Sequence, residues 1–292
     1  MTTALAAART ISRKRSAAWT AWLGLLPFFI FGLAFEFLPL LTVIRSSLTH
    51  EGALTLEFYH QALDPLFLRS FVNTIKLSAT TAGLGGVLGT LVAYAIVTTR
   101  NRFVQNALTA LSDVTTNFGG APLAFAFIVI LGSTGVITLL LKGAGIDLYP
   151  NFRIYSISGL TIAYLYFQLP LMILLIIPSL YGLKREWREA ALNLGASTFR
   201  YWIEIALPIL FPALVSGFLL LFANSFGAYA TAWTLTGSDV DLITIRIAAL
   251  IRGEVQLAPE LADALSMYSL LIMTACVVGY LWLSNVSRRA QG

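Results

Sequence analysis

Long apolar runs, each of a length that crosses a bilayer, dominate the pattern along the chain. A helix needs about 20 mostly apolar residues to cross ~30 Å of hydrocarbon. Six stretches meet this requirement, and shorter polar segments separate them. They are residues 22–44, 73–97, 107–141, 157–181, 209–235 and 265–286. The pattern therefore predicts an all-α, polytopic membrane protein with six transmembrane helices.

Two of these runs need a closer interpretation. Residues 107–141 are too long for one crossing and contain Gly119, Gly120 and Pro122, so we expect an amphipathic approach followed by a crossing after the proline. Residues 22–44 follow a basic cluster, as the core of a signal peptide does. The run is too long for such a core and lacks a small-residue cleavage site. It is predicted to remain as a membrane anchor.

The composition agrees with a membrane protein. Hydrophobic residues make up 58% of the 292 residues and charged residues 11%, against about 45–50% and about 25% in globular proteins. So few charges argue against a soluble enzyme. The net charge of +5 is modest and indicates membrane topology rather than nucleic-acid binding. The single cysteine, Cys276, excludes an internal disulfide and a cysteine metal cluster.

Lys and Arg in the short loops orient the bundle, because cytoplasmic loops carry an excess of positive charge. With the N-terminus in the cytoplasm, 12 of the 19 Lys and Arg lie on the inner side and 7 on the outer side or at its boundary. The inner set is Arg9, Arg13, Lys14, Arg15, Arg100, Arg102, Lys184, Arg185, Arg188, Arg200, Arg288 and Arg289. The sequence therefore predicts that both termini are cytoplasmic.

One cytoplasmic loop, residues 182–208, is longer than the others and has a helical pattern. Residues 186–208 read EWREAALNLGASTFRYWIEIALP. Glu189, Ala190 and Ala191 favour helix, and Gly195 suits a left-handed helix end. Leu192, Leu194, Phe199, Trp202 and Ile203 are apolar in a loop that should face water. The pattern is typical of a docking element for a partner protein, with a helix on the membrane surface as the alternative.

The spacing within this loop resembles the EAA loop of bacterial ABC importer permeases, the membrane subunits of binding-protein-dependent transport systems with the type I importer fold. The matching positions are Glu189, Ala190, Ala191, Gly195, Ile205, Leu207 and Pro208. The resemblance extends over residues 73–286, which it implies to be the permease core. Residues 1–72 would then hold the cytoplasmic N-terminus, an extra first helix and an outer segment, and residues 287–292 a cytoplasmic tail.

The resemblance implies a mechanism and a set of partners. The EAA loop would dock into a cleft of an ATPase, with Glu189 facing polar groups, Ala190 and Ala191 in close contact and Gly195 at the bend. The partners would be two ATP-binding cassette ATPases, a second permease, identical or homologous, an extracytoplasmic solute-binding protein and the bilayer, with no nucleic acid. The location would be the bacterial inner membrane.

The chain lacks the motifs of an enzyme or an ATPase. No G-x-x-x-x-G-K-[ST], H-E-x-x-H or G-x-S-x-G occurs in it. The glycines at 83, 85, 86 and 89 indicate close helix packing instead. His50 and His60 have no companion ligands and are interpreted as solvated loop residues. We therefore expect no cofactor, no metal and no catalytic residues in the chain itself, with ATP used by a partner subunit.

Polar residues inside the spans are the candidates for a translocation pathway, because polar groups are costly in lipid. Hydrogen bonding between helices is the alternative role for each of them. The candidates are Asp113, Asn117, Tyr164, Gln168, Asn224, Ser225 and Tyr229, with Thr116, Tyr166 and Thr231 beside them.

The solute is predicted to be small and hydrophilic. Residues 117–135 resemble a segment of spermidine/putrescine-type permeases, and Asp113 nearby would attract a cation, so a polyamine-like compound is the leading interpretation. The aromatic and amide groups would suit sugars or phosphonates equally well. An ion- or proton-coupled secondary transporter is the alternative function, although such proteins usually show internal repeats and midplane carboxylates, and neither is evident here.

Overall fold

The computed structural model describes residues 24–254 and 257–291, and these residues are mostly helical. The helices of the first half are η1 (Leu33–Phe37, π-helical), α2 (Leu38–Leu48), α3 (Glu57–Gln61), α4 (Pro65–Thr98), α5 (Arg102–Thr116), α6 (Gly120–Leu131) and α7 (Val136–Gly143). Those of the second half are α8 (Ile157–Tyr181), α9 (Arg185–Asn193), α10 (Thr198–Tyr201), η2 (Trp202–Ala206, π-helical), α11 (Leu207–Phe226), α12 (Tyr229–Thr236), α13 (Ile243–Arg252) and α14 (Pro259–Gln291). Strands β1 (Thr49–His50) and β2 (Ala53–Leu54) pair as a short antiparallel hairpin.

Six stretches of the described residues are long and apolar enough to cross a membrane, which confirms the predicted all-α, six-span fold. They are Gly24–Leu48, Pro65–Thr98, Gly120–Gly143, Ile157–Tyr181, Thr198–Phe226 and Pro259–Asn285. The predicted start of the first span at Trp22, and the cations at 9 and 13–15, lie outside the described residues.

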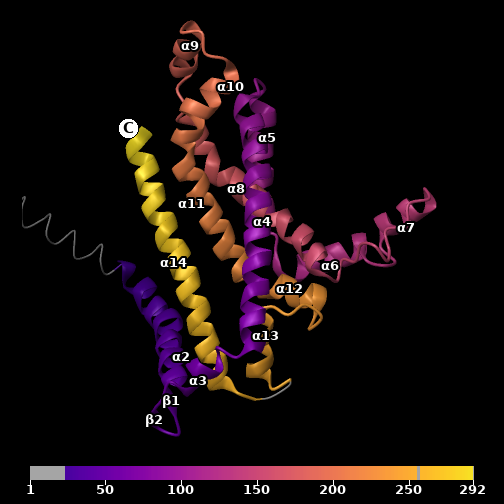
Figure 1. Cartoon of the computed structure of the whole chain (residues 1–292), viewed down its shortest axis with the longest axis vertical. Coiled ribbons are helices and arrows are strands. Elements are labelled where there is room, and N and C mark those ends of the chain that lie inside the picture. The colour runs from indigo at the N-terminus through magenta and orange to yellow at the C-terminus, as the bar shows by residue number, and fades with distance from the viewer. Residues whose placement is uncertain (1–23, 255–256, 292) are drawn as a thin grey trace, which may run out of the picture.

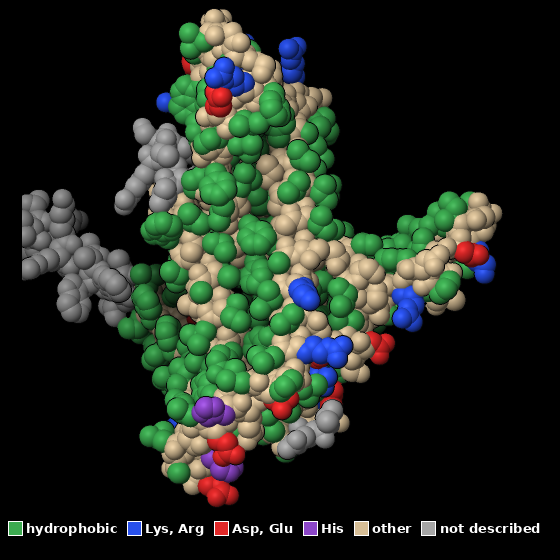
Figure 2. All heavy atoms as spheres, viewed as in Figure 1, with side chains coloured by type: hydrophobic (Ala, Val, Ile, Leu, Met, Phe, Trp, Pro, Cys, Tyr) green, Lys and Arg blue, Asp and Glu red, His purple; other side chains and the backbone are tan. Residues whose placement is uncertain are grey.

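The helices pack around α4, α8 and α11 (Figure 1). Helix α4 contacts α8 and α11, while α11 also contacts α14, which in turn packs on α2. Helices α9 and α10 lie at one end of the bundle, called here the α9 end, and the β-hairpin, α3 and α13 lie toward the other. The C-terminal part of α14 points toward the α9 end. Hydrophobic side chains are spread along the length of the face shown in Figure 2, as expected for a surface in contact with lipid.

Two of the four glycines in α4 allow the close helix packing that was predicted. A Cβ atom on Gly89 would lie 2.7 Å from Met172 Cβ in α8, and one on Gly85 would lie 3.0 Å from Gln168 Cβ. Met172 also approaches Gly217 in α11, where a Cβ would lie 2.7 Å from its sulfur. A Cβ on Gly83 or Gly86 would meet nothing within 4 Å, so the packing interpretation is wrong for these two positions.

The third apolar run forms three helices. Amphipathic α5 packs along α8 and ends before a break at residues 117–119, as the prediction of an amphipathic approach requires. The candidate span that follows is interrupted at residues 132–135, between α6 and α7. A Cβ on Gly132 or Gly135 would lie within 2.6 Å of a backbone oxygen, so this turn requires glycine at both positions. Helices α6 and α7 project away from the rest of the bundle (Figure 1).

The fifth span does not have the predicted limits of 209–235. A continuous helical stretch begins at Thr198, passes through η2 and ends at Phe226. Residues Gly227 and Ala228 then separate α11 from α12. The predicted loop 182–208 is therefore shorter than expected, since its second half is already part of the fifth span.

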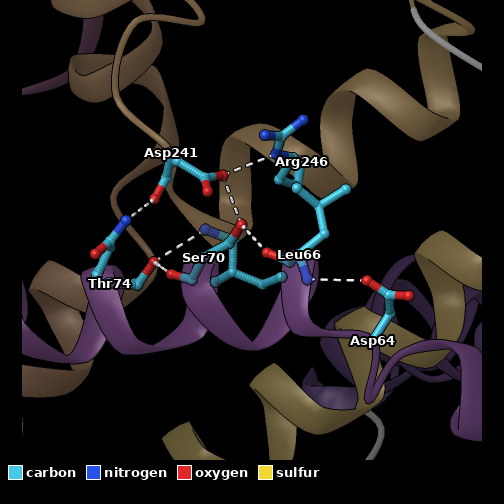
Figure 3. Close-up of polar contacts among 8 residues, drawn as sticks. Asp64, Leu66, Ser70, Thr74, Asp241 and Arg246 are labelled. Atoms are coloured by element: carbon cyan, nitrogen blue, oxygen red, sulfur yellow. Dashed lines mark hydrogen bonds and ion pairs between the residues drawn. The ribbon is translucent and has the colours of Figure 1, made fainter.

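A polar network fixes the loop before α13 to the beginning of α4 (Figure 3). Asp241 accepts hydrogen bonds from Ser70 Oγ at 2.6 Å and from Arg246 Nε at 2.8 Å, both on Oδ1. The Ile243 amide donates to Thr74 Oγ1 at 2.9 Å, and the side chain of Asn73 donates to the Asp241 carbonyl at 3.1 Å. Figure 3 shows Asp241 between Arg246 and Ser70. The network provides hydrogen-bond partners for backbone groups of the loop that no helix or strand pairs.

Candidate functional site: a docking tip and a central cavity

Helix α9 and the turn after it form an exposed tip at the α9 end. The turn closes through hydrogen bonds from the Gly195 amide to the Leu192 carbonyl and from the Ala196 amide to the Ala191 carbonyl, each 3.0 Å long. Gly195 has φ +82°, a left-handed conformation that favours glycine at a helix end. The Ser197 side chain then accepts a bond from the Arg200 amide and caps the next helix. The predicted bend at Gly195 is present.

The three EAA residues differ in their surroundings. Glu189 is exposed and forms an ion pair of 2.7 Å with Arg185 one turn earlier. Ala190 is exposed, while Ala191 is buried against Tyr201 and Ala206. The expectation that both alanines contact a partner is therefore wrong for Ala191, which instead attaches α9 to the helix of the fifth span.

Large apolar side chains surround the exposed part of the tip. Leu194 is 88% exposed and Phe199 74% exposed, and Leu192 is also exposed. Exposed apolar groups of this size, beside the small side chain of Ala190, are typical of a protein contact surface.

The last three motif residues lie elsewhere. Ile205 belongs to η2, and Leu207 and Pro208 begin α11, so all three are part of the fifth-span helix. Ile205 packs against the cluster that contains Ala191, while Leu207 and Pro208 are exposed. The prediction that these three residues lie in the docking loop is therefore corrected. They belong to the helix of the fifth span, which carries the tip at its start.

A second candidate site is a cavity of about 620 Å³ at the breaks in two apolar runs. The breaks are residues 117–119, before α6, and 227–228, after α11. Thr231 Oγ1 donates to the Gly120 carbonyl at 3.3 Å and connects the two breaks. Gly120 has φ +70°. Because the glycines at these breaks have no side chain, the backbone lies close to the cavity. The same glycines end the helices within apolar sequence, where the backbone borders a cavity instead of lipid.

The cavity brings together three of the seven predicted pathway residues. Asn117, Asn224 and Tyr229 line it, as do Thr116 and Thr231. Among the described residues the lining contains no charged side chain. The Tyr229 hydroxyl is buried without a hydrogen-bond partner within the described residues. Such a neutral, polar wall can hydrogen-bond a hydrophilic solute without holding it by charge.

Three other pathway candidates make hydrogen bonds between helices instead. Tyr164 donates to the Ala228 carbonyl at 2.6 Å, and Gln168 Nε2 donates to the Leu221 carbonyl at 2.7 Å. Ser225 Oγ lies 2.9 Å from Thr81 Oγ1. All three side chains are buried, which favours the alternative of interhelical bonding that the sequence left open.

Asp113 and Tyr166 also lie outside the central cavity. Asp113 lines a different cavity of about 520 Å³ with residues of α5 and α8. Tyr166 packs edge to face against Phe118 and Phe127. Asp113 is one of the two observations behind the prediction of a cationic solute, and its side chain does not line the central cavity.

One residue near the cavity was not predicted. The guanidinium of Arg252, at the end of α13, lies 5.6 Å from the ring centroid of Tyr229 and 5.4 Å from that of Trp233. These contacts place the positive charge of Arg252 against the ring of Tyr229, which is a residue of the cavity wall. In the sequence Arg252 follows an apolar stretch in an outer segment, and nothing there indicates a contact with α12.

The histidines do not form a metal site with other ligands. The ring of His50 packs edge to face against Phe58. Residues 24–254 and 257–291 contain no group of three or more His, Cys, Asp or Glu side chains suited to a metal ion.

The chain matches known transport proteins in sequence. It is 28% identical over 229 residues to the ferric transport system permease protein FbpB of Actinobacillus pleuropneumoniae, covering 74% of this chain and 32% of that protein. It is 27% identical over 230 residues to the molybdenum transport system permease protein ModB of Mycobacterium bovis, covering 76% and 82%. Sulfate permease 2 of Chlamydomonas reinhardtii is 24% identical, with 79% of this chain and 60% of that protein covered. The chain thus spans less than two thirds of the length of the ferric and sulfate relatives.

The fold matches solved transporters. A chain of a bacterial ABC transporter involved in the import of the acidic polysaccharide alginate superimposes with a TM-score of 0.69 at 18% identity, covering 96% of this chain and 98% of that one. A chain of the MetNI methionine ABC transporter gives a TM-score of 0.55 at 14% identity, covering 77% and 96%. These likenesses confirm the permease fold predicted from the EAA spacing.

The relatives are permeases rather than enzymes, and they are named for iron, molybdenum and sulfate, not for a polyamine. The family model for the "binding-protein-dependent transport system inner membrane component" matches residues 85–292, well over half of the chain. The protein therefore belongs to this family, the membrane-spanning permeases of ABC importers.

Proposed function

We propose that this permease pairs with a second permease subunit and is coupled through α9 to two ATPases that drive import of a small hydrophilic solute. A solute-binding protein outside the membrane would deliver the solute. The exposed tip of α9, with Ala190, Leu194 and Phe199, is the observation that carries this proposal. Residues 73–286 would form the permease core, and the first span would be an additional helix.

The second permease subunit is supported by the surfaces that the bundle leaves uncovered. Helices α6 and α7 extend away from the bundle (Figure 1) and expose Val129, Val136 and Leu140. The central cavity is also not enclosed, as expected for half of a pathway that a second subunit completes.

Coupling is tested by reversing the charge of Glu189. Glu189→Lys and Gly195→Pro should leave the protein in the membrane but abolish ATP-driven uptake and copurification with the ATPases. Proline cannot adopt the positive φ of Gly195. Glu204→Lys is the matched control, because Glu204 forms the same type of exposed ion pair with Arg200, 2.9 Å long, away from the tip. Normal uptake and copurification in both tip variants would contradict the proposal.

Two classes of solute compete. A polyamine-like cation rests on the resemblance of residues 117–135 and on Asp113, which lies outside the central cavity. An inorganic oxyanion is supported by relatives named for sulfate and molybdenum. We favour the oxyanion. The test is ligand binding by the cognate solute-binding protein across sulfate, molybdate, ferric iron, spermidine and a neutral sugar; tight binding of spermidine alone would restore the cation.

The α9 end is proposed to face the cytoplasm, with both termini on that side. In a Cys276→Ala background, Ala53→Cys in the β-hairpin should react with an impermeant maleimide in intact cells. Leu194→Cys should react only after permeabilisation. Labelling of Leu194→Cys in intact cells would reverse the topology.

A further inference from the structure

A third cavity, of about 680 Å³, lies at the α9 end, where α4 and α8 both finish. Its wall combines residues from the ends of these two spans with residues from α9 and from the start of the fifth span. The cavity therefore lies at the boundary between the apolar spans and the exposed tip. It is separate from the central cavity, since the two have no lining residue in common.

The wall of this cavity is strongly cationic. Arg100, Lys184, Arg185 and Arg188 line it, against one acidic residue, Glu189. Glu189 is paired with Arg185 at 2.7 Å. Within the described part of the chain, Arg100, Lys184 and Arg188 have no carboxylate at ion-pair distance. Three positive charges from two separate segments thus converge on one space in which, among the described residues, the one carboxylate is already paired with Arg185.

The N-terminus of α9 adds to the positive potential. Lys184 is the N-cap residue of this helix, and no side chain caps the amides of its first turn. Lys184 and Arg185 both line the cavity, so this helix end lies at its edge. Free amides and the helix dipole at an N-terminus favour an anion.

Apart from Thr98, the rest of the wall is apolar and aromatic. Val97 and Leu180 come from the last turns of α4 and α8, and Trp202 packs edge to face on Tyr94. Figure 2 shows basic side chains beside hydrophobic ones at this end of the molecule. A site for a free inorganic anion does not need an apolar wall at the ends of two spans, whereas the acyl and glycerol part of a lipid does. Basic pockets between transmembrane helices bind the head groups of anionic lipids.

We propose that this cavity binds a phosphate group, and specifically the phosphodiester of an anionic phospholipid such as phosphatidylglycerol. Arg100, Lys184 and Arg188 contact the phosphate, while the side chains of Val97, Leu180 and Trp202 contact the apolar part of the lipid. A lipid held there bridges the end of α4 to α9 and so fixes the tip relative to the spans.

Lipid binding to the purified full-length chain in neutral detergent tests the proposal. Dihexanoyl phosphatidylglycerol, dihexanoyl phosphatidylcholine and inorganic phosphate are titrated, and binding is read by native mass spectrometry. Wild type should prefer the anionic lipid. Arg100→Gln combined with Arg188→Gln should weaken its binding roughly 30-fold, because each basic residue near an anionic lipid contributes about fivefold.

Two further variants make the result specific. Arg100→Lys combined with Arg188→Lys keeps both charges and should retain most of the binding, which separates loss of charge from misfolding. Arg200→Gln removes a cation at the same end that does not line the cavity, and it should bind as wild type does. Equal binding of the two lipids, or undiminished binding by the Gln variant, would overturn the proposal. If millimolar inorganic phosphate displaces the lipid from wild type, and the Gln variant no longer binds inorganic phosphate, then the ligand is free phosphate and not a lipid.

Discussion

The hydroxyl of Tyr164 in α8 donates a 2.6 Å hydrogen bond to the carbonyl oxygen of Ala228, at the break between α11 and α12. One turn further along α8, Gln168 donates to the Leu221 carbonyl of α11 at 2.7 Å. A helix that ends inside an apolar region leaves carbonyl groups that water does not reach. The Tyr164 hydroxyl therefore stabilises the break that opens the central cavity, while Gln168 joins α8 to the interior of α11.

Tyr164→Phe is expected to destabilise the protein, because the Ala228 carbonyl loses its partner. Leaving a buried acceptor unsatisfied costs about 1–3 kcal/mol. Thermal unfolding in detergent should show a lower midpoint, and uptake by the assembled importer should fall. Tyr166→Phe is the control, since the partners of Tyr166 are aromatic rings that phenylalanine also contacts. Equal midpoints for the two variants would contradict a structural role for Tyr164.

Gly89→Ala is expected to separate α4 from α8. The added Cβ would lie 2.7 Å from Met172 Cβ and 2.8 Å from the Leu169 carbonyl oxygen. Overpacking of this kind costs about 1–3 kcal/mol. Gly86→Ala, one turn away and with nothing within 4 Å, should have the stability of wild type or slightly more. Unfolding of both variants in the same detergent provides the comparison.

Asn117→Leu and Asn224→Leu are expected to reduce uptake without reducing stability. Both side chains are exposed to the central cavity, so their replacement leaves no buried group unpaired. Proteoliposomes containing the whole importer would measure uptake, and thermal unfolding would measure stability. Asp113→Asn should leave uptake nearly unchanged, because Asp113 lines another cavity. Strong inhibition by Asp113→Asn alone would place the pathway beside α5 instead.

Asp241→Ala is expected to release the loop before α13 from α4. Arg246 would lose its ion pair, and the Ser70 hydroxyl would keep only its longer bond to the Leu66 carbonyl, at 3.2 Å. We expect a loss of about 1–3 kcal/mol in the free energy of unfolding, the usual cost of unpaired polar groups. Asp239→Ala provides the control, since Asp239 is an exposed acidic residue in the same loop. Faster proteolysis of the loop in Asp241→Ala only would confirm the local effect.

The sequence predicts α8 correctly because its limits coincide with strong local signals. Ser156 caps the first turn, and Gly182 follows the last residue. The limits of the fifth span could not be predicted in the same way. Pro208 reads as a boundary, but it follows π-helical η2, where the Leu207 amide bonds to the Trp202 carbonyl, and the helix continues through it. The break at Gly227 has no polar residue next to it and depends on Tyr164 of another helix.

In the candidate sites, too, the sequence predicts what depends on neighbouring residues and does not predict what depends on packing between helices. The EAA spacing locates the exposed tip, because Gly195 and the alanines are close together in sequence. It does not show which alanine is exposed, since burial of Ala191 depends on Tyr201 and Ala206. For the pathway, polar residue type alone cannot separate Asn224, in the cavity wall, from its neighbour Ser225, which bonds to Thr81. Successive helical residues point in different directions, and only the packing of α4 and α8 decides their roles.

The continuous helical stretch from Thr198 to Phe226 connects the exposed tip to the edge of the central cavity. Its 29 residues span ~43 Å at 1.5 Å per residue. A tilt of about 10° about the α9 end moves the other end by roughly 7 Å, which exceeds the pitch of one helical turn. That other end is Phe226, adjacent to the cavity residues Asn224 and Gly227. A tilt of this helix would thus reshape the cavity wall by several ångströms, less the bending taken up at π-helical η2 and at Pro212, where the regular hydrogen bonding is interrupted.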